Sequence, residues 1–355
     1  GAGLRLCCAV RPCRRTLSRR QAAARAGRPP LRVLERRRVS ALLEVRDLAK
    51  SYRGRHGGAL RALDGVSFTL SRGEVLGVVG ESGCGKTTLG RAVLRLVEPD
   101  GGTVSFEGED LLKLSRGALA RKRRDLQIVF QDPFGSLNPR HCVATIIGEP
   151  IVVHGAGDAK ARVREMLELV GLPPDAGERF PHEFSGGQRQ RIAIARALAL
   201  HPKLLVADEP VSALDVSIQS QIINLIADLR TRLGLSMIFI SHDLSVIRHV
   251  SDRIAVMYFG KIVEVGRAAD VFEHPAHPYT RALLSAIPKP GAGRRRERVV
   301  LQGEIPDPAN PPQGCAFHGR CREATARCAT ERPELGSRAT PDGAREVACH
   351  LHRPT

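Results

Sequence analysis

The chain has 355 residues, of which 42% are hydrophobic and 26% charged, and its formal net charge is +18. This length and apolar content suit one large globular domain or two modest ones. No apolar run approaches the roughly eighteen residues that span a bilayer, and nine cysteines are too sparse for a small disulfide scaffold. The composition therefore excludes an integral membrane protein and a chain held together mainly by disulfides.

The positive charge is concentrated at the start of the chain. Residues 1–40 contain twelve arginines and a single acidic residue, Glu35, a net charge of +11 that leaves +7 for the remaining 315 residues. We interpret this segment as a basic, disordered leader; contact with anionic lipid or nucleic acid and an organelle transit peptide are the alternatives. The remaining charge excess is too small to predict a nucleic-acid partner.

Hydrophobic periodicity from residue 41 onward predicts alternating strands and helices. Residues 43–45 and 66–70 alternate between apolar and polar, as strands with one buried face do, and residues 75–79 form a continuous apolar strand. A helix is expected from about Thr87 to Leu96. Further strands are expected at 203–207, 237–241 and 254–258, and a long helix at 215–233. This pattern predicts an α/β fold with a central, mainly parallel sheet.

Composition also divides the chain into parts. Residues 135–200 have helical periodicity and few strand signals, which indicates a helical insertion within a domain at 41–287. From residue 288 onward proline, glycine, arginine and cysteine dominate, which is typical of a linker followed by a small C-terminal module. We therefore expect three parts, at 1–40, 41–287 and 288–355.

A phosphate-binding loop is predicted at residues 80–87, which read Gly-Glu-Ser-Gly-Cys-Gly-Lys-Thr and match G-x-x-x-x-G-K-[ST]. Glycines allow the backbone N–H groups to surround phosphates, and the following helix N-terminus adds positive potential. Lys86 can reach the β- and γ-phosphates, and the Thr87 hydroxyl can bind Mg²⁺. The alternative is an ordinary glycine turn, but the apolar strand before it and the helix after it favour the phosphate site.

Two carboxylates follow another apolar strand. Asp208 and Glu209 come directly after residues 204–207. Carboxyl ends of parallel strands meet at one edge of a sheet, so Asp208 can orient the Mg²⁺ shell and Glu209 can polarise an attacking water. An acidic pair alone would suggest a solvated loop; beside a phosphate loop, it indicates catalysis.

Residues 185–188, here named the signature turn, read Ser-Gly-Gly-Gln, and a helix is expected to follow from Gln188 to Leu200. The turn completes a recognisable set of motifs. Together with the phosphate loop, Gln131, Asp208-Glu209, the Ser-Ala-Leu-Asp run at 212–215 and His242, the chain resembles the ATPase subunits of ABC transporters. The resemblance implies a P-loop NTPase fold with an antiparallel β subdomain and a helical insertion. It also implies a head-to-tail pair in which each ATP lies between one phosphate loop and the other subunit's signature turn.

The resemblance implies roles for individual residues. Tyr52 would stack on adenine, Gln131 would contact Mg²⁺ or the attacking water, and Asp215 would order the pair's interface. His242 would touch the γ-phosphate. A partly buried strand-end tyrosine, a helix N-cap at Asp215 and a structural histidine are the respective alternatives.

The implied residues fall into two groups. The implied catalytic residues are Lys86, Gln131, Glu209 and His242. The implied ATP- and Mg²⁺-binding residues are Tyr52, Gly80, Ser82, Gly83, Cys84, Gly85, Lys86, Thr87, Thr88, Gln131, Ser185, Gly186, Gly187, Gln188, Asp208 and Asp215.

Three further runs, at 131–139, 277–284 and 310–315, resemble the oligopeptide/dipeptide (and nickel) importer branch of this family. Gly319 departs slightly, since many relatives have proline there. The resemblance implies an ATP-hydrolysing subunit, peripheral at the cytoplasmic face of the inner membrane. Its implied partners are a second ATPase subunit (a copy or a relative), two membrane permease subunits and an extracytoplasmic substrate-binding protein, with no nucleic acid.

Four cysteines gather near the end of the chain, at Cys315, Cys321, Cys328 and Cys349. Their spacing lacks the C-x-x-C pairs usual for zinc, and wider spacing suits a four-iron, four-sulfur ([4Fe–4S]) cluster. The resemblance to peptide-importer tails points the same way. Zinc, disulfides and free thiols remain alternatives, with His318 and His350 as other candidate ligands.

Three rival functions remain open at this stage. The first is a soluble ABC ATPase of DNA repair or translation, although the chain has neither a second nucleotide domain nor a long coiled-coil insertion. The second treats the cysteine tail as a redox-sensing regulatory module. The third keeps the importer and changes its cargo to nickel or another small solute.

Overall fold

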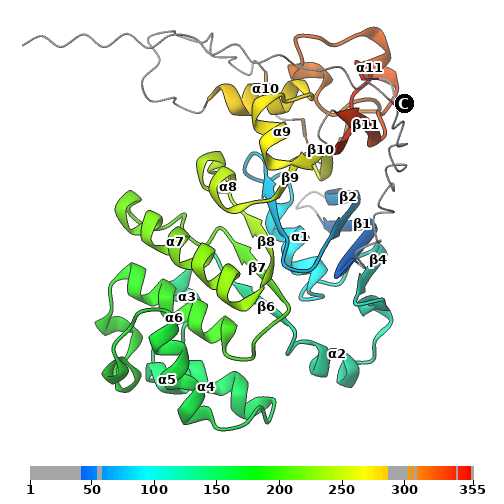
Figure 1. Ribbon diagram of the computed structural model, residues 1–355. Coiled ribbons are helices and arrows are strands. Elements are labelled where there is room, and N and C mark those ends of the chain that lie inside the picture. The colour runs from blue at the N-terminus through cyan, green and yellow to red at the C-terminus, as the bar shows by residue number, and fades with distance from the viewer. Residues whose placement is uncertain are drawn as a thin grey trace, which may run out of the picture. The chain divides into compact units, whose positions relative to one another are not determined.

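A computed structural model describes residues 41–53, 58–286, 303–304, 306–307, 310–340 and 343–352. The predicted leader, residues 1–40, lies outside the described residues. Within them the chain forms an antiparallel sheet, a larger central sheet and a set of helices (Figure 1). No helix in this part of the chain is long and apolar enough to cross a membrane.

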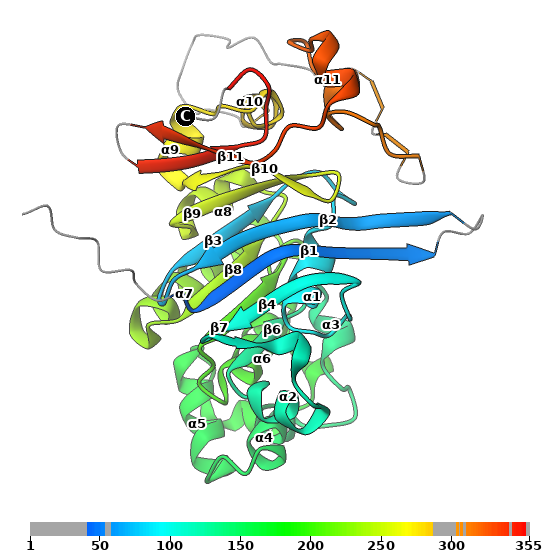
Figure 2. The same cartoon turned by 90° about the vertical axis from the view of Figure 1, so that its right-hand side faces the viewer.

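The smaller sheet is antiparallel throughout and has the order β2-β1-β4-β5. Its strands are β1 (Leu43–Arg53), β2 (Ala59–Leu70), β4 (Gly101–Phe106) and β5 (Glu109–Asp110). Figure 2 shows β1, β2 and β4 lying side by side. Val45 of β1 pairs with Phe68 and Val104, and all three side chains are buried. This is the antiparallel β subdomain that the resemblance implied.

The central sheet has the order β11-β12-β10-β9-β3-β8-β7-β6. The five strands from β9 to β6 run parallel, and β10, β12 and β11 continue the sheet antiparallel. Every residue of β3, β7 and β8 is buried, as expected for strands covered on both faces. The bounds are β3 Val75–Val79, β6 Leu126–Val129, β7 Leu204–Asp208, β8 Ser236–Ile240, β9 Arg253–Tyr258, β10 Lys261–Arg267, β11 Gly336–Thr340 and β12 Gly343–Val347. The mainly parallel sheet is confirmed.

Helices connect these strands and cover the central sheet. The predicted helix at 215–233 is α7 (Val216–Leu233), which buries Ile222, Ile226 and Leu229 and ends at Gly234 in the left-handed conformation. The helix after the phosphate loop, α1 (Lys86–Val93), is shorter than expected. The others outside the insertion are η1 (Leu111–Lys113), α2 (Arg116–Lys122), α8 (Leu244–Val250), α9 (Ala268–Glu273), α10 (Pro278–Ser285), η4 (His318–Arg320) and α11 (Ala326–Thr330).

The segment predicted as a helical insertion contains only helices among its described elements (green in Figure 1). They are α3 (Pro133–Ser136), α4 (Val143–Val153), α5 (Ala159–Leu169), η2 (Pro174–Glu178), η3 (Pro181–Glu183) and α6 (Gly186–Leu198). Apolar side chains such as Ile147, Met166 and Ile192 form its buried interior. The exact division of the chain at 41–287 and 288–355 stays a prediction.

The tail differs from the separate module that the sequence suggested. Strand β12 pairs with β10 at Glu264↔Val347 and Val265↔Glu346, so the tail's hairpin extends the central sheet. Phe317 is buried in the same apolar core as the sheet. The physical reason is twofold: β10 would otherwise leave an open sheet edge, and a small Pro/Gly-rich segment has little apolar surface for a core of its own.

Candidate nucleotide-binding site

The phosphate loop joins β3 to α1 and has a backbone that only glycine tolerates at two positions. Gly80 and Gly85 have φ values of 157° and 106°. A Cβ atom on either would come within 2.2 Å of a backbone oxygen, that of Met257 or Ala62 respectively. The loop backbone therefore packs closely against β2 and β9, and this packing fixes the curvature of the loop.

Lys86 lies buried within this loop. Its Nζ donates to the carbonyl oxygens of Gly80 at 2.8 Å and Glu81 at 2.9 Å, and its side chain is 5% exposed. The ammonium is thus held at the centre of the loop and at the N-terminus of α1, where the sequence motif predicts phosphates.

Thr87 and Asp208 meet beside the loop. The Thr87 hydroxyl donates to Asp208 Oδ1 at 3.0 Å, and Asp208, the last residue of β7, is 1% exposed. Burial raises the pKa of Asp208, against the lowering effects of the Thr87 hydrogen bond and of nearby Arg91 and Lys86. Its Oδ2 is buried and has no hydrogen-bond partner among the described residues. An orphaned carboxylate oxygen next to a phosphate loop has the chemistry that a hydrated Mg²⁺ requires.

Two of the predicted residues, Gln131 and His242, contact the carboxylate of a third, Glu209. Glu209 Oε2 accepts a hydrogen bond from Gln131 Nε2 at 3.1 Å and lies 3.2 Å from His242 Nδ1. Gln131 follows β6, Glu209 follows β7 and His242 follows β8, so adjacent strands bring them together. Glu209 has a φ of 45°, a left-handed conformation uncommon outside glycine, held by its N–H bonding the Ile240 carbonyl at 3.0 Å.

The signature turn opens a helix, but earlier than expected. Helix α6 begins at Gly186 rather than at Gln188, and Ser185 is its N-cap. Ser185 Oγ accepts from Gln188 N at 3.3 Å while Gln188 Oε1 accepts from Ser185 N at 3.0 Å, a reciprocal capping box. A Cβ on Gly187 would lie 2.5 Å from Ile218 Cγ2, so the turn packs closely on α7.

The remaining predicted residues have simpler surroundings. Tyr52 lies near the end of β1 with 39% of its surface exposed, and Lys50 Nζ is 5.6 Å from its ring centroid. Asp215 occupies the N-cap position of α7, yet its side chain makes no capping hydrogen bond there, so the N-cap alternative lacks its expected contact. In the loop, Ser82 is exposed and Cys84 is buried. Thr88 is half-buried in the first turn of α1.

Two residues that sequence reasoning missed also contact the phosphate loop. The backbone N–H of Glu81 donates to Tyr279 Oη at 2.9 Å, and the Glu81 carboxylate receives hydrogen bonds from Arg320. Tyr279 and Arg320 lie 198 and 239 residues further along the chain, so no local pattern could have indicated these contacts.

The tail cysteines gather around one small cavity. Cys315, Cys321, Cys328 and Cys349 all line it, and each is a free thiol. Burial, together with the other three thiols nearby, raises the pKa of Cys349 to about 11. The disulfide alternative therefore finds no support here. Within the described ranges, no group of three or more His, Cys, Asp or Glu side chains is placed to hold a metal ion. The four thiols line one cavity, but the expected iron–sulfur cluster is not supported, because the described residues form no metal-binding group there.

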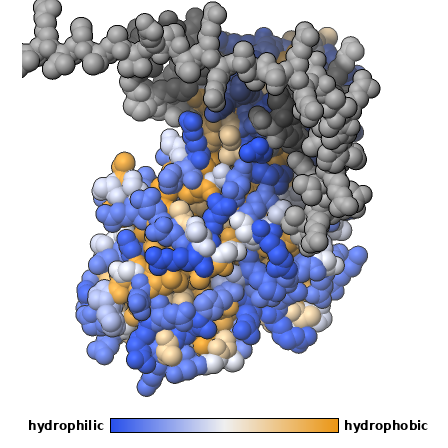
Figure 3. All heavy atoms as spheres, in the orientation of Figure 1, coloured by the Kyte–Doolittle hydropathy of each residue, from blue (hydrophilic) through white to orange (hydrophobic). Residues whose placement is uncertain are grey.

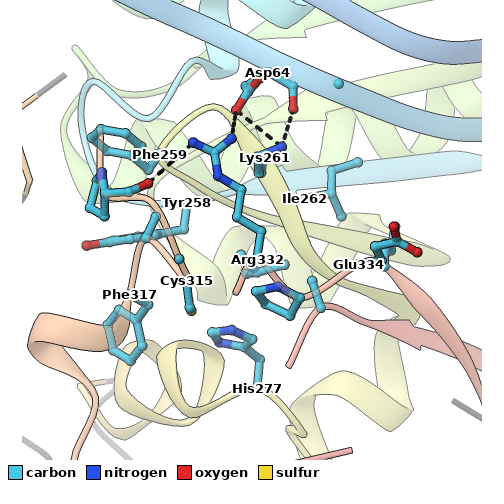
Figure 4. A pocket seen from close by; sticks show the side chains of 18 of the residues that line it. Asp64, Tyr258, Phe259, Lys261, Ile262, His277, Cys315, Phe317, Arg332 and Glu334 are labelled. Atoms are coloured by element: carbon cyan, nitrogen blue, oxygen red, sulfur yellow. Dashed lines mark hydrogen bonds and ion pairs between the residues drawn. The ribbon is translucent and has the colours of Figure 1, made fainter. Parts of the chain in front are cut away.

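A larger cavity of about 450 Å³ lies between the tail and the strands β2 and β10. Figure 4 shows Arg332 and Lys261 converging on Asp64, with Tyr258 and Phe317 nearby. Both cations lie 3.2 Å from Asp64 Oδ2. No residue of the phosphate loop lines this cavity, so it is not the nucleotide site.

Comparisons with known proteins agree with this geometry. The ABC transporter family matches residues 63–212, and the oligopeptide/dipeptide transporter C-terminal region matches residues 263–328. The oligopeptide transport ATP-binding protein AppF of Bacillus subtilis is 51% identical over 323 residues, covering 88% of this chain and 97% of AppF. The dipeptide transport ATP-binding protein DppF of Haemophilus influenzae is 52% identical over 279 residues, covering 78% of this chain and 85% of DppF.

Solved structures give the same answer for the fold. The ATP-binding cassette MJ0796, determined as a dimer in a post-hydrolysis state with ADP and Pi, is 28% identical with a TM-score of 0.58, covering 64% of this chain and 98% of that one. Its P-loop fold is the α/β fold described above. The chain belongs to the ATP-binding subunits of ABC transporters, in the oligopeptide/dipeptide branch.

Proposed function

We propose that this chain hydrolyses ATP within a pair of ATPase subunits and thereby powers the uptake of short peptides through two membrane permease subunits. The observation that carries the proposal is the convergence of Gln131 and His242 on Glu209, beside the Thr87–Asp208 pair. These groups suit metal-assisted transfer of a phosphoryl group to water.

Mg²⁺ fits the residues present. Thr87, Gln131 and Asp208 would hold it, directly or through water, and the unpaired Asp208 Oδ2 supports this assignment. When bound, the ion neutralises charge on the β- and γ-phosphate oxygens. Lys86 then stabilises the γ-phosphate from the loop's centre, where its ammonium already lies.

Glu209 is the group we assign to the attacking water. Its side chain is 15% exposed, so it is accessible yet largely shielded. As a carboxylate it accepts the water's proton or polarises the O–H bond, while Gln131 orients the water. His242 is 59% exposed, and its Nδ1 lies 3.2 Å from Glu209 Oε2. In this position it would contact the γ-phosphate and connect it to Glu209.

The signature turn supports the pairing of two subunits. Ser185 and the first N–H groups of α6 form a helix N-terminus suited to anions, and this helix has thirteen residues. In a head-to-tail pair each turn would close the other subunit's nucleotide site, with Tyr52 against adenine and Asp215 at the interface. The related cassette described above was solved as a dimer, which favours the same arrangement.

The helical region is the surface that we assign to the permeases, at the cytoplasmic face of the inner membrane. It carries exposed hydrophobic residues at Val152, Val153 and Phe180, and Figure 3 shows hydrophobic residues among polar ones over this region. The 131–139 run begins next to it and includes α3. A substrate-binding protein would deliver the cargo from outside.

For the four tail cysteines we propose a [4Fe–4S] cluster, with zinc as the alternative. All four line one cavity, and as thiolates they would be the ligands of the cluster. Bound metal would lower the raised pKa values of Cys315, Cys321 and Cys349 and add folding energy to the tail. Anaerobically prepared protein should be brown and contain about four iron per chain. Replacing Cys321 by Ser should remove the colour and increase protease cleavage of the tail. Zinc in place of iron would overturn the cluster, and metal-free protein would overturn both.

Transport itself is tested by reconstitution with the permeases and the binding protein in vesicles. Peptide cargo predicts that labelled di- and tripeptides accumulate only when ATP is supplied, and that peptide-loaded binding protein stimulates ATP hydrolysis. If binding protein loaded with nickel or another solute stimulates ATP hydrolysis instead, the cargo is that solute and not peptide. A rate of ATP hydrolysis that does not change when the permeases and the binding protein are added would favour a non-transport ATPase.

A further inference from the structure

Glu81, the second residue of the phosphate loop, is held by the tail. Arg320 donates from Nη1 to Glu81 Oε2 at 2.7 Å and from Nη2 to Glu81 Oε1 at 3.0 Å. The Glu81 backbone N–H is bound separately by Tyr279 Oη at 2.9 Å. Side chain and backbone of one loop residue are therefore both fixed by residues beyond the ATPase motifs.

This ion pair is largely shielded from water. The Arg320 side chain is 8% exposed and that of Glu81 is 24% exposed. Bidentate arginine–carboxylate pairs are among the strong hydrogen-bonded pairs, and removing one partner leaves a poorly solvated charge. The hydrogen bonds to Glu81 raise the pKa of Arg320, so the guanidinium stays charged.

Arg320 is itself fixed by a packed aromatic group. Arg320 is the last residue of η4 (His318–Arg320), and Phe317 directly precedes this helix. The Phe317 ring lies 5.3 Å from that of Tyr258 and 5.4 Å from that of Tyr279. Arg320 Nη1 also lies 3.4 Å from Tyr258 Oη. The guanidinium is therefore positioned by the core and does not sample the many orientations of a surface arginine.

The location gives the pair a consequence for nucleotide binding. The Glu81 carbonyl oxygen accepts from Lys86 Nζ at 2.9 Å, so Glu81 belongs to the wall of the anion site. A free carboxylate at that position would repel phosphates, whereas a paired one would not. We propose that Arg320 is a positioning residue of the nucleotide site, which neutralises Glu81 and holds its side chain away from the phosphates.

The proposal makes the tail part of the nucleotide site. The turn that carries Arg320 runs from Cys315 to Cys321, and both cysteines line the four-thiol cavity. Arg320 therefore connects this turn directly to the phosphate loop, and Phe317 connects it indirectly, by packing on Tyr279. The inference rests on the chain's own ion pair and holds whether or not the thiols bind metal.

The test is a charge cycle measured on the purified full chain with fluorescent nucleotide competition. Arg320→Ala leaves Glu81 unpaired and should weaken ATP binding about tenfold, ADP less, and adenosine not at all, because repulsion scales with ligand charge. Glu81→Gln leaves Arg320 as an extra positive charge and should tighten ATP. The double variant has neither charge and should return to near wild-type affinity. Arg320→Lys should fall between wild type and Arg320→Ala.

Arg332→Ala is the matched control, because Arg332 also joins the tail to the β2 strand but pairs with Asp64 and not with the loop. It should bind ATP like wild type. Equal losses for ATP and adenosine in Arg320→Ala, or no recovery in the double variant, would mean that Arg320 only supports the tail's structure and would overturn the proposal. If Arg320→Ala does not fold, Glu81→Gln is the deciding variant. An ATP affinity equal to or lower than that of wild type in Glu81→Gln would contradict the proposal.

Discussion

At the scale of single residues, the sequence identified residues that follow strand ends and missed the contacts that depend on tertiary packing. Gln131, Glu209 and His242 each follow a parallel strand, which places them at one edge of the sheet. Their mutual contacts also require that β6, β7 and β8 are neighbours, which the structure shows and the sequence did not. The Arg320–Glu81 pair was not predicted either, because only the folded tail brings the two residues together. The early start of α6 at Gly186 was also missed, since the Ser185 capping box overrides glycine's poor helix propensity.

Asp208 gives a prediction about metal dependence. Asp208→Asn keeps an oxygen for the Thr87 hydroxyl but removes the negative charge that the unpaired Oδ2 carries. We expect half-maximal ATP hydrolysis to need about 10- to 100-fold more Mg²⁺. Thr87→Ser, which retains the hydroxyl, is the matched control and should change the Mg²⁺ titration little. An unchanged titration in Asp208→Asn would remove Asp208 from the metal site.

At the scale of elements, the central sheet and α7 agreed with the sequence pattern because their apolar periodicity is strong and their strands are fully buried. The tail did not. A two-residue pairing of β12 with β10 is invisible in composition, which shows only prolines, glycines and cysteines after residue 288. A segment that looks independent by composition thus completes an edge of the main sheet.

His277, the N-cap of α10, gives a prediction about pH. It is 1% exposed, and burial, together with nearby His352 and Arg281, lowers its pKa to about 3. In the unfolded chain His277 takes up a proton near pH 6.5, whereas in the folded chain it stays neutral until about pH 3. His277 therefore lowers the free energy of unfolding as the pH falls from 6.5 toward 3. Wild type should lose about 1.4 kcal/mol more than His277→Asn between pH 7.5 and 5.5 in urea unfolding. His274→Asn, at an exposed histidine, should behave like wild type; equal losses in all three proteins would contradict the assignment.

At the scale of the whole molecule, the phosphate loop is where the parts of the described chain meet. The antiparallel sheet contacts it at Ala62, the central sheet at Met257, and the tail through Tyr279 and Arg320. Glu209 and its partners lie at the carboxyl ends of neighbouring strands of the same central sheet. This arrangement gives each part of the fold a route to the nucleotide, which suits a subunit that converts ATP binding and hydrolysis into movement of its partners.

The assignment of Glu209 to the attacking water is tested most directly by the ATP turnover of Glu209→Gln. The amide keeps the size of the side chain and its contact with Gln131 but cannot accept the water's proton. We predict that the variant binds ATP like wild type and hydrolyses it about 10²- to 10⁴-fold more slowly, in a single-turnover measurement with radiolabelled ATP. Hydrolysis at the wild-type rate, with ATP binding intact, would contradict the account.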